Sequence, residues 1–182
     1  MADLMDMLLQ RRSIRKYTGE TIPDELLEKV LAAGLASETS RNTRCWEFIV
    51  VRDKEMLAKM AHFRLHSALM LEGADAAVVV IADEEKSDVW TEDCSIAMAH
   101  MHLMADQLGL GSCWIQGRNR RCEDDSMTSE EYLRGLLGFP QNMRLEAVLS
   151  LGMIEQHPDS HTEDSLKWEK IHREKWTQIF RA

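Results

Sequence analysis

The most constraining feature of the chain is residues 92–108, a stretch that is apolar around almost its whole circumference when drawn as a helix. Its apolar side chains are Ile96, Ala97, Met98, Ala99, Met101, Leu103, Met104, Ala105 and Leu108. A helix with almost no polar face is either deeply buried or covered by a partner. The chain has 182 residues, the usual size of one domain, so part of such a helix should remain uncovered. We therefore expect residues 92–108 to lie at an interface between subunits.

The rest of the chain alternates helix-forming and strand-forming segments of unequal length. Periodicity predicts further helices at 3–11, 23–35, 53–71 and 129–137, and strands at 46–51, 76–81, 112–116 and 144–151. The segment 76–81, AAVVVI, is apolar on both faces and predicts a central strand, whereas the alternation in 144–151 predicts one buried face. This order favours an α+β or three-layer α/β/α domain over a regular array of β–α–β units.

Local signals refine three of these elements. Pro23 is expected in the first turn of its helix, where its missing N–H costs nothing. The segment 46–51, WEFIVV, is rich in strand formers and predicts a buried strand. Gly138 and Pro140 are expected to close the helix at 129–137.

The chain is acidic, with a formal net charge of −9. That charge repels phosphates and counts against nucleic-acid binding. The N-terminal segment MADLMDMLLQRR has acidic residues before its apolar ones and basic residues after them, the reverse of a secretory signal. No apolar run approaches the roughly 20 residues that cross a bilayer. We therefore expect a cytoplasmic protein that contacts neither nucleic acid nor a membrane.

The reactive side chains form no recognisable metal or nucleophile motif. The four cysteines include no C-x-x-C pair, and we expect free thiols at Cys45, Cys94, Cys113 and Cys122. His62 and His66 have helical spacing but lack a third ligand at a characteristic distance. The sequence therefore predicts no metal site and no side chain that acts as a covalent catalyst.

Three segments offer groups that bind polar or flat ligands. Residues 11–17, RRSIRKY, hold four cations and a hydroxyl; arginine pairs bidentately with phosphate, although many such runs are solvated patches. Residues 40–46, SRNTRCW, offer hydroxyl and amide groups. Residues 109–117, GLGSCWIQG, lack the third glycine of a dinucleotide fingerprint and follow a helix. They indicate either a strand end whose backbone meets a flat ligand, or a helix end followed by a core strand.

Taken in order, these segments resemble the FMN-dependent nitroreductases. The series is R-R-S-I-R-K-Y, S-R-N-T-R-x-W-E-F-I-V-V, D-C-S-I-A and G-L-G-S-C-W-I, and the resemblance covers residues 8–152. It implies an α+β, three-layer α/β/α fold with a mainly antiparallel central sheet, in an intertwined homodimer. Residues 1–152 would form the FMN-binding core. Residues 153–182 would form an arm that embraces the partner, with 92–108 at the interface.

The resemblance also implies where FMN binds. The implied cofactor-binding residues are Arg11, Arg12, Ser13, Arg15, Thr39, Ser40, Asn42, Ile115, Gln116 and Gly117. Those at 11–15 match the group that holds the phosphate and ribityl chain, with Arg15 as the cation near the N1–C2 edge of the ring. Those at 39–42 match a loop donated by the second subunit, and those at 115–117 match the strand end whose backbone faces the ring near N5.

The sequence departs from the family pattern at three places. Cys45 replaces a proline before the tryptophan of the loop, which either loosens that loop or brings a thiol near the flavin. A late Lys or Arg that completes the phosphate site is missing, and His157 or His161 is left as a substitute. Ser67 and Met70 stand where some relatives have an amide and a lysine near the ring.

The function implied is transfer of electrons from NADH or NADPH, through FMN, to a small acceptor such as a nitroaromatic or a quinone, by a ping-pong hydride-transfer route. Residues 117–131 would form a lid over the acceptor pocket. The alternative is a flavin-binding sensor or carrier with little turnover, which the missing late cation favours. A nucleic-acid contact at residues 11–16 is a third hypothesis, and the net charge of −9 opposes it.

Overall fold

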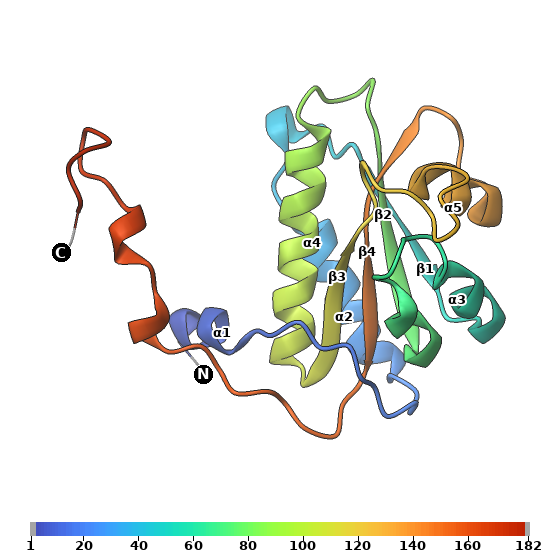
Figure 1. Ribbon diagram of the computed structural model, residues 1–182, viewed down its shortest axis with the longest axis horizontal. Helices are drawn as coiled ribbons and strands as arrows, with labels where there is room; N and C mark the ends of the chain where they lie inside the picture. Colours follow the sequence, from blue (N-terminus) through green and yellow to red (C-terminus); the bar gives the residue numbers. More distant parts are fainter. Residues whose placement is uncertain (1–2, 181–182) are drawn as a thin grey trace.

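The computed structural model describes residues 3–180 and builds them around an antiparallel sheet in the order β1-β2-β4-β3 (Figure 1). The strands of this sheet are β1 (Trp46–Val51), β2 (Ala76–Asp83), β3 (Leu110–Gln116) and β4 (Met143–Met153). The α-helices are α1 (Leu4–Gln10), α2 (Asp24–Leu35), α3 (Lys54–Met60), α4 (Trp90–Gln107) and α5 (Ser129–Leu137). The expected α+β class with an antiparallel central sheet is confirmed.

Apolar side chains on the two faces of the sheet form two cores, and helices cover both (Figure 1). On one face, Val78 and Val80 of β2 pack with Met98 and Met101 of α4 and with residues of α2. On the other face, the intervening side chains of β2 pack against α3 and α5. Burial of apolar surface on both sides stabilises the sheet, and the three-layer α/β/α arrangement is confirmed.

The central strands are β2 and β4, and both are buried on both faces. This confirms the prediction for residues 76–81 and corrects the one for 144–151. The alternation in β4 misled because its polar residues are buried with partners: Glu146 accepts from Gln116 Nε2 (3.3 Å), and Ser150 lies 2.7 Å from the Tyr17 hydroxyl. A polar side chain with such a partner tolerates burial.

Strand β1 begins and ends as predicted, at Trp46 and Val51, but it lies at the edge of the sheet. It pairs with β2, and Glu47 and Val50 are exposed. The prediction of a buried strand was therefore wrong for the middle of β1, because strand-forming residues do not distinguish an edge from a centre.

The helix ends follow local chemistry where the signals are strong. Helix α5 begins with a capping box, in which Thr128 and Glu131 satisfy each other's backbone N–H, and it ends at Gly138 with φ 75°. Pro23 is the N-cap residue of α2 rather than a residue of its first turn, a correction of one position.

The helix predicted at 53–71 ends at Met60, and only a short 3-10 turn forms at Leu69–Gly73. Phe63 leaves the helical path and is fully buried in the second core. The backbone N–H of Leu65 donates to the carbonyl of Arg121 (3.1 Å), and His66 adopts a φ of 57°. Tertiary packing therefore overrides the weak helical pattern here.

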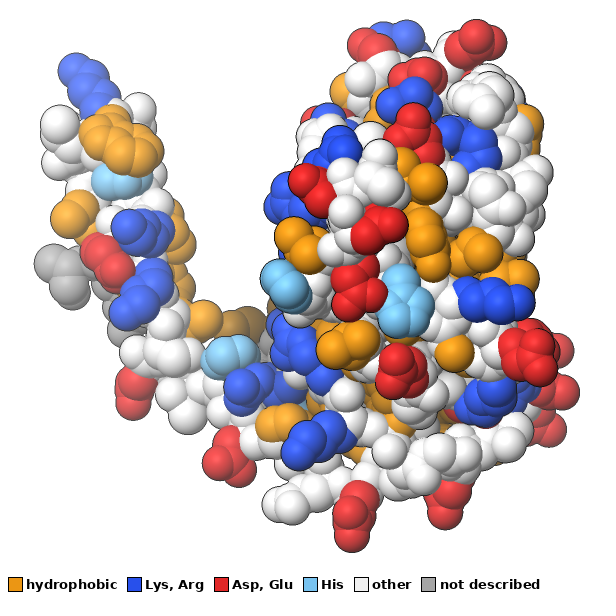
Figure 2. All heavy atoms as spheres, turned by 45° about the vertical axis from the view of Figure 1, so that its right-hand side comes forward, with side chains coloured by type: hydrophobic (Ala, Val, Ile, Leu, Met, Phe, Trp, Pro, Cys, Tyr) orange, Lys and Arg blue, Asp and Glu red, His pale blue; other side chains and the backbone are white. Residues whose placement is uncertain are grey.

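The segment after β4 projects away from the globular part of the chain (Figures 1 and 2). Within residues 154–180 it forms two 3-10 turns, Glu163–Ser165 and Trp168–Lys170. It forms no α-helix there, although apolar residues recur at helical spacing in the sequence of 166–180. Trp176 is 82% exposed. A short helix is marginal without packing, and this segment packs its apolar side chains on little of its own subunit.

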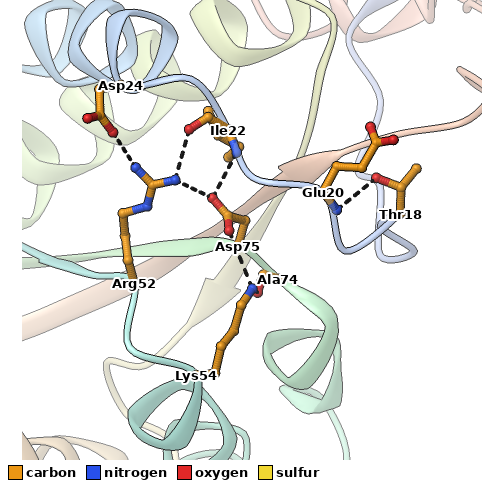
Figure 3. Close-up of polar contacts among 8 residues, drawn as sticks. All are labelled: Thr18, Glu20, Ile22, Asp24, Arg52, Lys54, Ala74 and Asp75. Atoms are coloured by element: carbon orange, nitrogen blue, oxygen red, sulfur yellow. Dashed lines mark hydrogen bonds and ion pairs between the residues drawn. The ribbon is translucent and has the colours of Figure 1, made fainter.

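Hydrogen bonds and ion pairs centred on Asp75 connect the chain segments at one end of the sheet (Figure 3). Asp75 accepts from the backbone N–H of Ile22 (2.9 Å), from Arg52 Nη2 (2.7 Å) and from Lys54 Nζ (3.4 Å). Burial alone would raise the pKa of Asp75, but these donors hold it below its ordinary value. Arg52 also pairs with Asp24, so its charge is fully matched by acids.

Candidate functional site

Strand β3 presents a free edge, because its other edge pairs with β4. Gly117 donates its backbone N–H to Glu146 on the β4 side (3.1 Å), and residues of an antiparallel strand alternate between the two sides. The backbone groups of Ser112, Trp114 and Gln116 therefore point away from the sheet. The Ser112 carbonyl accepts from Ile14 N–H (2.9 Å), and the Trp114 carbonyl accepts from Cys113 Sγ (3.6 Å). No described residue bonds to the Gln116 backbone groups on this edge, which leaves them open to a ligand.

The segment with the basic run is anchored across β3 and β4 by close packing. A side chain at Gly152 would lie about 2.5 Å from the Tyr17 ring, so only glycine permits this contact. The Tyr17 hydroxyl donates to the Ile14 carbonyl (2.9 Å) and also lies 2.7 Å from Ser150 Oγ. These contacts fix the path of residues 11–17 along the beginning of β3.

Arg11 is held by a histidine rather than by an acid. Its Nη1 donates to His102 Nε2 (2.8 Å), and His102 Nδ1 lies 2.5 Å from Ser112 Oγ. A guanidinium has only donors, so Nε2 is the unprotonated nitrogen and Nδ1–H donates to the Ser112 hydroxyl. Burial first, and then the charge of Arg11, lowers the pKa of His102 to about 4. The ring therefore orients Arg11 without neutralising it.

Arg12 lies beside a second polar pair. Its backbone N–H donates to Asp106 Oδ1 (3.2 Å), and its guanidinium donates to the carbonyl of Asp159. His157 Nε2 lies 2.9 Å from the same Asp106 oxygen, and its Nδ1 lies 2.6 Å from the carbonyl of Pro158. Both ring nitrogens of His157 face oxygen atoms, so the ring joins Asp106 to the Pro158 carbonyl beside Arg12.

The structure thus distinguishes the two histidines that the sequence left open. His157 lies at the basic run, while His161 is exposed there and contributes its backbone N–H to the Leu9 carbonyl (2.9 Å). Ser13 and Arg15 are exposed beside this group, and Arg15 Nη1 reaches the Ser13 carbonyl (3.4 Å). Among residues 3–180, no carboxylate forms an ion pair with Arg11, Arg12 or Arg15.

The loop at residues 39–44 is organised by one buried carboxylate at the start of α4. Asp93 is 2% exposed and accepts from Ser40 N–H (2.8 Å), Ser87 Oγ (3.0 Å) and Cys45 Sγ (3.4 Å). Arg41, Asn42 and Arg44 all have positive φ, a strained path that these bonds support. Burial and the Asp93 carboxylate raise the pKa of the Cys45 thiol, so Cys45 ties the loop down as a buried donor.

A single subunit does not bring this loop to the basic run. Ser40 is bonded to Asp93 and Arg12 to Asp106, near opposite ends of α4, roughly 20 Å apart at 1.5 Å per residue. Thr39 and Asn42 belong to the same loop as Ser40. By contrast, the segments 11–15 and 115–117 are both next to β3. Ile14 donates its N–H to Ser112 near the beginning of the strand, and residues 115–117 lie at its end.

The end of β3 is shaped by packing as well as by hydrogen bonds. Ile115 is buried in the second core, and Gln116 accepts from Trp114 Nε1 (2.9 Å). A Cβ at Gly117 would lie 2.5 Å from the Leu145 side chain, so glycine is required there by the protein itself. The sequence offered two interpretations of residues 109–117. The helix end is present at Gly109 (φ 75°), and the strand with an open edge is present as well.

Three residues that the sequence analysis did not single out also belong to this region. His102 and Asp106 lie one turn apart on α4, and both are buried. Two polar residues one turn apart in an otherwise apolar helix are a pattern that the sequence already shows. Arg64 is half-buried, and its charge, like those of Arg11 and Arg15, acts on the Cys113 thiol of β3. Burial nevertheless raises the pKa of that thiol.

The arginines of this region differ from five others in the described chain, each of which forms an ion pair with Asp or Glu. These five are Arg41, Arg52, Arg121, Arg134 and Arg144 (Figure 3 shows Arg52). Arg11, Arg12, Arg15 and Arg64 form no such pair there, although the chain carries a net charge of −9. Arginines without acidic partners, gathered at an open strand edge, are suited to binding an anionic ligand.

Two further features limit the chemistry of the described residues. Between residues 3 and 180, no group of three or more His, Cys, Asp or Glu side chains is arranged to hold a metal ion. In the same part of the chain, no helix is both long enough and apolar enough to cross a membrane.

Comparisons with known proteins give consistent relatives. The profile of the nitroreductase family matches residues 8–69 and 59–153. An Archaeoglobus fulgidus protein, provisionally named NADH dehydrogenase/NAD(P)H nitroreductase, is 40% identical over 97% of this chain and 100% of its own. An NADPH-flavin oxidoreductase of Vibrio harveyi is 30% identical over 90% of this chain and 69% of its own. The solved FMN-dependent nitroreductase of Clostridium difficile R20291 has a TM-score of 0.91 at 40% identity, covering 95% of this chain and 100% of its own.

Proposed function

The chain belongs to the nitroreductase family of oxidoreductases, and we propose that it uses FMN to pass electrons from NADH or NADPH to a small acceptor such as a nitroaromatic or a quinone. The observation that carries this proposal is the row of acid-free arginines, Arg11, Arg12 and Arg15, along the open edge of β3. The names of the relatives, an NADPH-flavin oxidoreductase and an FMN-dependent nitroreductase, support the same cofactor.

The residues present fit FMN. The guanidinium groups of Arg11 and Arg12 and the hydroxyl of Ser13 would hold its phosphate and ribityl chain, because a charge-assisted pair with phosphate needs donors that no protein acid has taken. His157, bonded to Asp106 next to Arg12, would take the place of the missing late Lys or Arg. Arg15 would provide positive charge for the ring, and the open backbone groups near Gln116 would meet its edge. Ile115 and Gly117 position that strand end.

FMN, when bound, supplies the redox chemistry: it takes two electrons from the nicotinamide and passes them on to the acceptor. The protein binds, orients and tunes. A fixed positive charge at Arg15 would favour the reduced cofactor, since preorganised charge acts where negative charge develops. We expect ping-pong kinetics, with donor and acceptor using the same space in turn, and we propose no side chain as a covalent catalyst. Residues 117–131 would line that space.

We further propose that the protein is a homodimer whose second subunit completes each site. The outer surface of α1, α2 and α4 has an apolar hollow of about 320 Å³, lined by Leu4, Met7, Ala33, Ala36, His100, Leu103 and Met104. Such a surface is suited to a partner subunit. The loop containing Thr39, Ser40 and Asn42 would then reach the partner's FMN, and residues 153–182 would embrace the partner around the core formed by 1–152.

An anaerobic titration tests the proposed function. The purified protein, loaded with FMN, is mixed with NADH or NADPH while the flavin absorbance is followed. Loss of the oxidised-flavin absorbance, and its return on addition of a quinone, is expected. A protein that binds FMN but is reduced by neither nicotinamide would be the alternative, a flavin sensor or carrier. A protein that cannot be loaded with FMN would contradict both.

A further inference from the structure

Outside the basic run at residues 11–17, two arginines are brought together from distant parts of the chain. Arg64 follows α3, and Arg120 lies in the loop after β3. The two segments are joined by backbone hydrogen bonds: Leu65 N–H donates to the Arg121 carbonyl (3.1 Å), and Glu123 N–H donates to the His62 carbonyl (2.9 Å). Arg64 and Arg120 are therefore carried on neighbouring, hydrogen-bonded segments.

The acids of this loop are all engaged elsewhere. Glu123 pairs with His62, and Asp125 pairs with Arg121. Asp124 accepts from Cys122 Sγ (3.0 Å) and Ser126 Oγ (2.7 Å). Within residues 3–180, neither Arg64 nor Arg120 forms an ion pair with a carboxylate.

This arrangement is unfavourable in the absence of an anion. Burial, and then the charge of Arg120, lowers the pKa of Arg64. Placing two like charges together while acids in the same loop pair with other groups costs free energy, and such arrangements are concentrated at functional sites. A ligand with an oxyanion group would remove the repulsion and satisfy both guanidinium groups.

The pair lies near both the basic run and a surface cavity. The charge of Arg64, like those of Arg11 and Arg15, lowers the pKa of the Cys113 thiol, although burial raises it overall, so the three arginines surround the same residue of β3. Arg120 lines a surface cavity of about 310 Å³ whose lining also includes Arg118 and Asn119. The acids that line this cavity, Glu84 and Glu130, pair with Arg144, so they do not neutralise Arg120.

We propose that Arg64 and Arg120 form a second anion-binding subsite, separate from the basic run that would hold the FMN phosphate. This subsite selects an electron donor or acceptor that carries a phosphate or a carboxylate. This rests on the proposed function, because it names which partners of the oxidoreductase are preferred. The two sources of the anion are the extra phosphate of NADPH and a carboxylate on the acceptor.

Steady-state kinetics of the double variant Arg64→Gln/Arg120→Gln test the subsite with two matched pairs of substrates. One pair is NADPH and NADH, and the other is para-nitrobenzoate and para-nitrobenzamide. For one pair we expect the KM of the charged member to rise roughly tenfold or more, the effect of losing a charge-assisted hydrogen bond. The readout is the KM of the member with the extra anionic group divided by the KM of the member without it, because a general change in turnover or binding affects both members of a pair alike. The pair that responds identifies the source of the anion.

Arg121→Gln is the matched control, because it removes a neighbouring arginine whose charge Asp125 already matches. If the ratio of the two KM values within each pair were equal in the wild type, the double variant and the control, the subsite would be overturned. A thermal melt of each variant establishes that it is folded.

Binding without turnover separates this proposal from the proposed function. Calorimetric titration with para-nitrobenzoate and para-nitrobenzamide needs no electron transfer. If the protein cannot be reduced by a nicotinamide, the proposed function fails. The subsite is still supported if the double variant loses its preference for the carboxylate, and it is overturned if the wild type and the double variant bind both compounds equally.

Discussion

The two ends of the β3 edge hold their arginines in different ways. At the beginning of the strand, Arg11 donates to His102, and the Arg12 backbone donates to Asp106, which also bonds to His157. Near its end, Arg120 Nη1 donates to the exposed carbonyl of Asn119 (3.1 Å), and the acids around Arg64 and Arg120 pair with other groups. Both ends present positive charge, but only the first is oriented by buried polar partners.

The difference indicates two kinds of ligand. Oriented donors lose little conformational entropy when they bind, so the beginning of β3 is suited to a group that stays bound, such as the FMN phosphate. Unsupported arginines are satisfied when a ligand arrives and are exposed again when it leaves, which suits substrates that exchange at each turnover.

The double variant Arg11→Met/Arg12→Met should nearly abolish FMN binding. Each arginine contributes a charge-assisted contact of about 2 kcal/mol to a phosphate, so the affinity should fall by roughly 1,000-fold. Quenching of FMN fluorescence measures it. The fold should persist, because neither side chain forms an ion pair with an acid of the described residues. If Arg64→Gln/Arg120→Gln weakened FMN binding equally, the distinction between the two ends would be wrong.

Protonation of His102 should destabilise the first end below neutral pH. Its pKa is lowered to about 4, whereas in the unfolded chain it is near 6.5. Between those values the unfolded state binds the proton and the folded state does not, so the free energy of unfolding falls as pH falls through this window. The loss approaches roughly 3 kcal/mol by pH 4, and little changes above pH 7.

Urea denaturation at pH 7 and near pH 4.5 measures this loss. Other carboxylates also titrate at low pH, so His102→Gln is the reference: it keeps an acceptor for Arg11 but does not titrate. The wild type should lose more stability than the variant. The same loss in both proteins would show that His102 is not held neutral.

His157→Gln should weaken FMN binding about tenfold, because it removes the ring that bonds to the Asp106 carboxylate next to Arg12. His157→Lys, which places a permanent cation beside Asp106, should restore most of the affinity. His161→Gln is the control, since its side chain lies exposed outside this group. Equal losses from His157→Gln and His161→Gln would remove His157 from the phosphate end.

Arg120→Gln should have the smallest effect on FMN, within about twofold, because Arg120 belongs to the second end. FMN fluorescence quenching is again the measurement. A tenfold loss would instead extend the cofactor site to the end of the loop, and both ends would then serve one ligand.

Local sequence signals predicted the fold where the residues of one segment determine its structure. AAVVVI predicted the central strand β2, and Gly138 with Pro140 predicted the end of α5. They failed where distant residues decide. Glu146 is buried because Gln116 reaches it, and the helix after Asp53 ends early because Phe63 enters the second core.

The site shows the same division. The basic run could be located from its composition alone, but its support by His102, Asp106 and His157 depends on how α4 and the C-terminal segment lie against it. The pairing of Arg64 with Arg120 depends on a hydrogen-bonded contact between segments far apart in the chain. That the residues at 11–15, 39–42 and 115–117 bind FMN remains a prediction from resemblance.

Comparing FMN with riboflavin, which lacks the phosphate, tests whether the arginines at the beginning of β3 hold the phosphate of the cofactor. Each is titrated into the wild type and into Arg11→Met/Arg12→Met, with fluorescence quenching as the signal. We predict that the wild type prefers FMN by roughly 100-fold or more, and that the double variant loses most of this preference while binding riboflavin nearly as before. Equal affinity of the wild type for both flavins would contradict the account, because the arginines at the beginning of β3 would then not hold a phosphate.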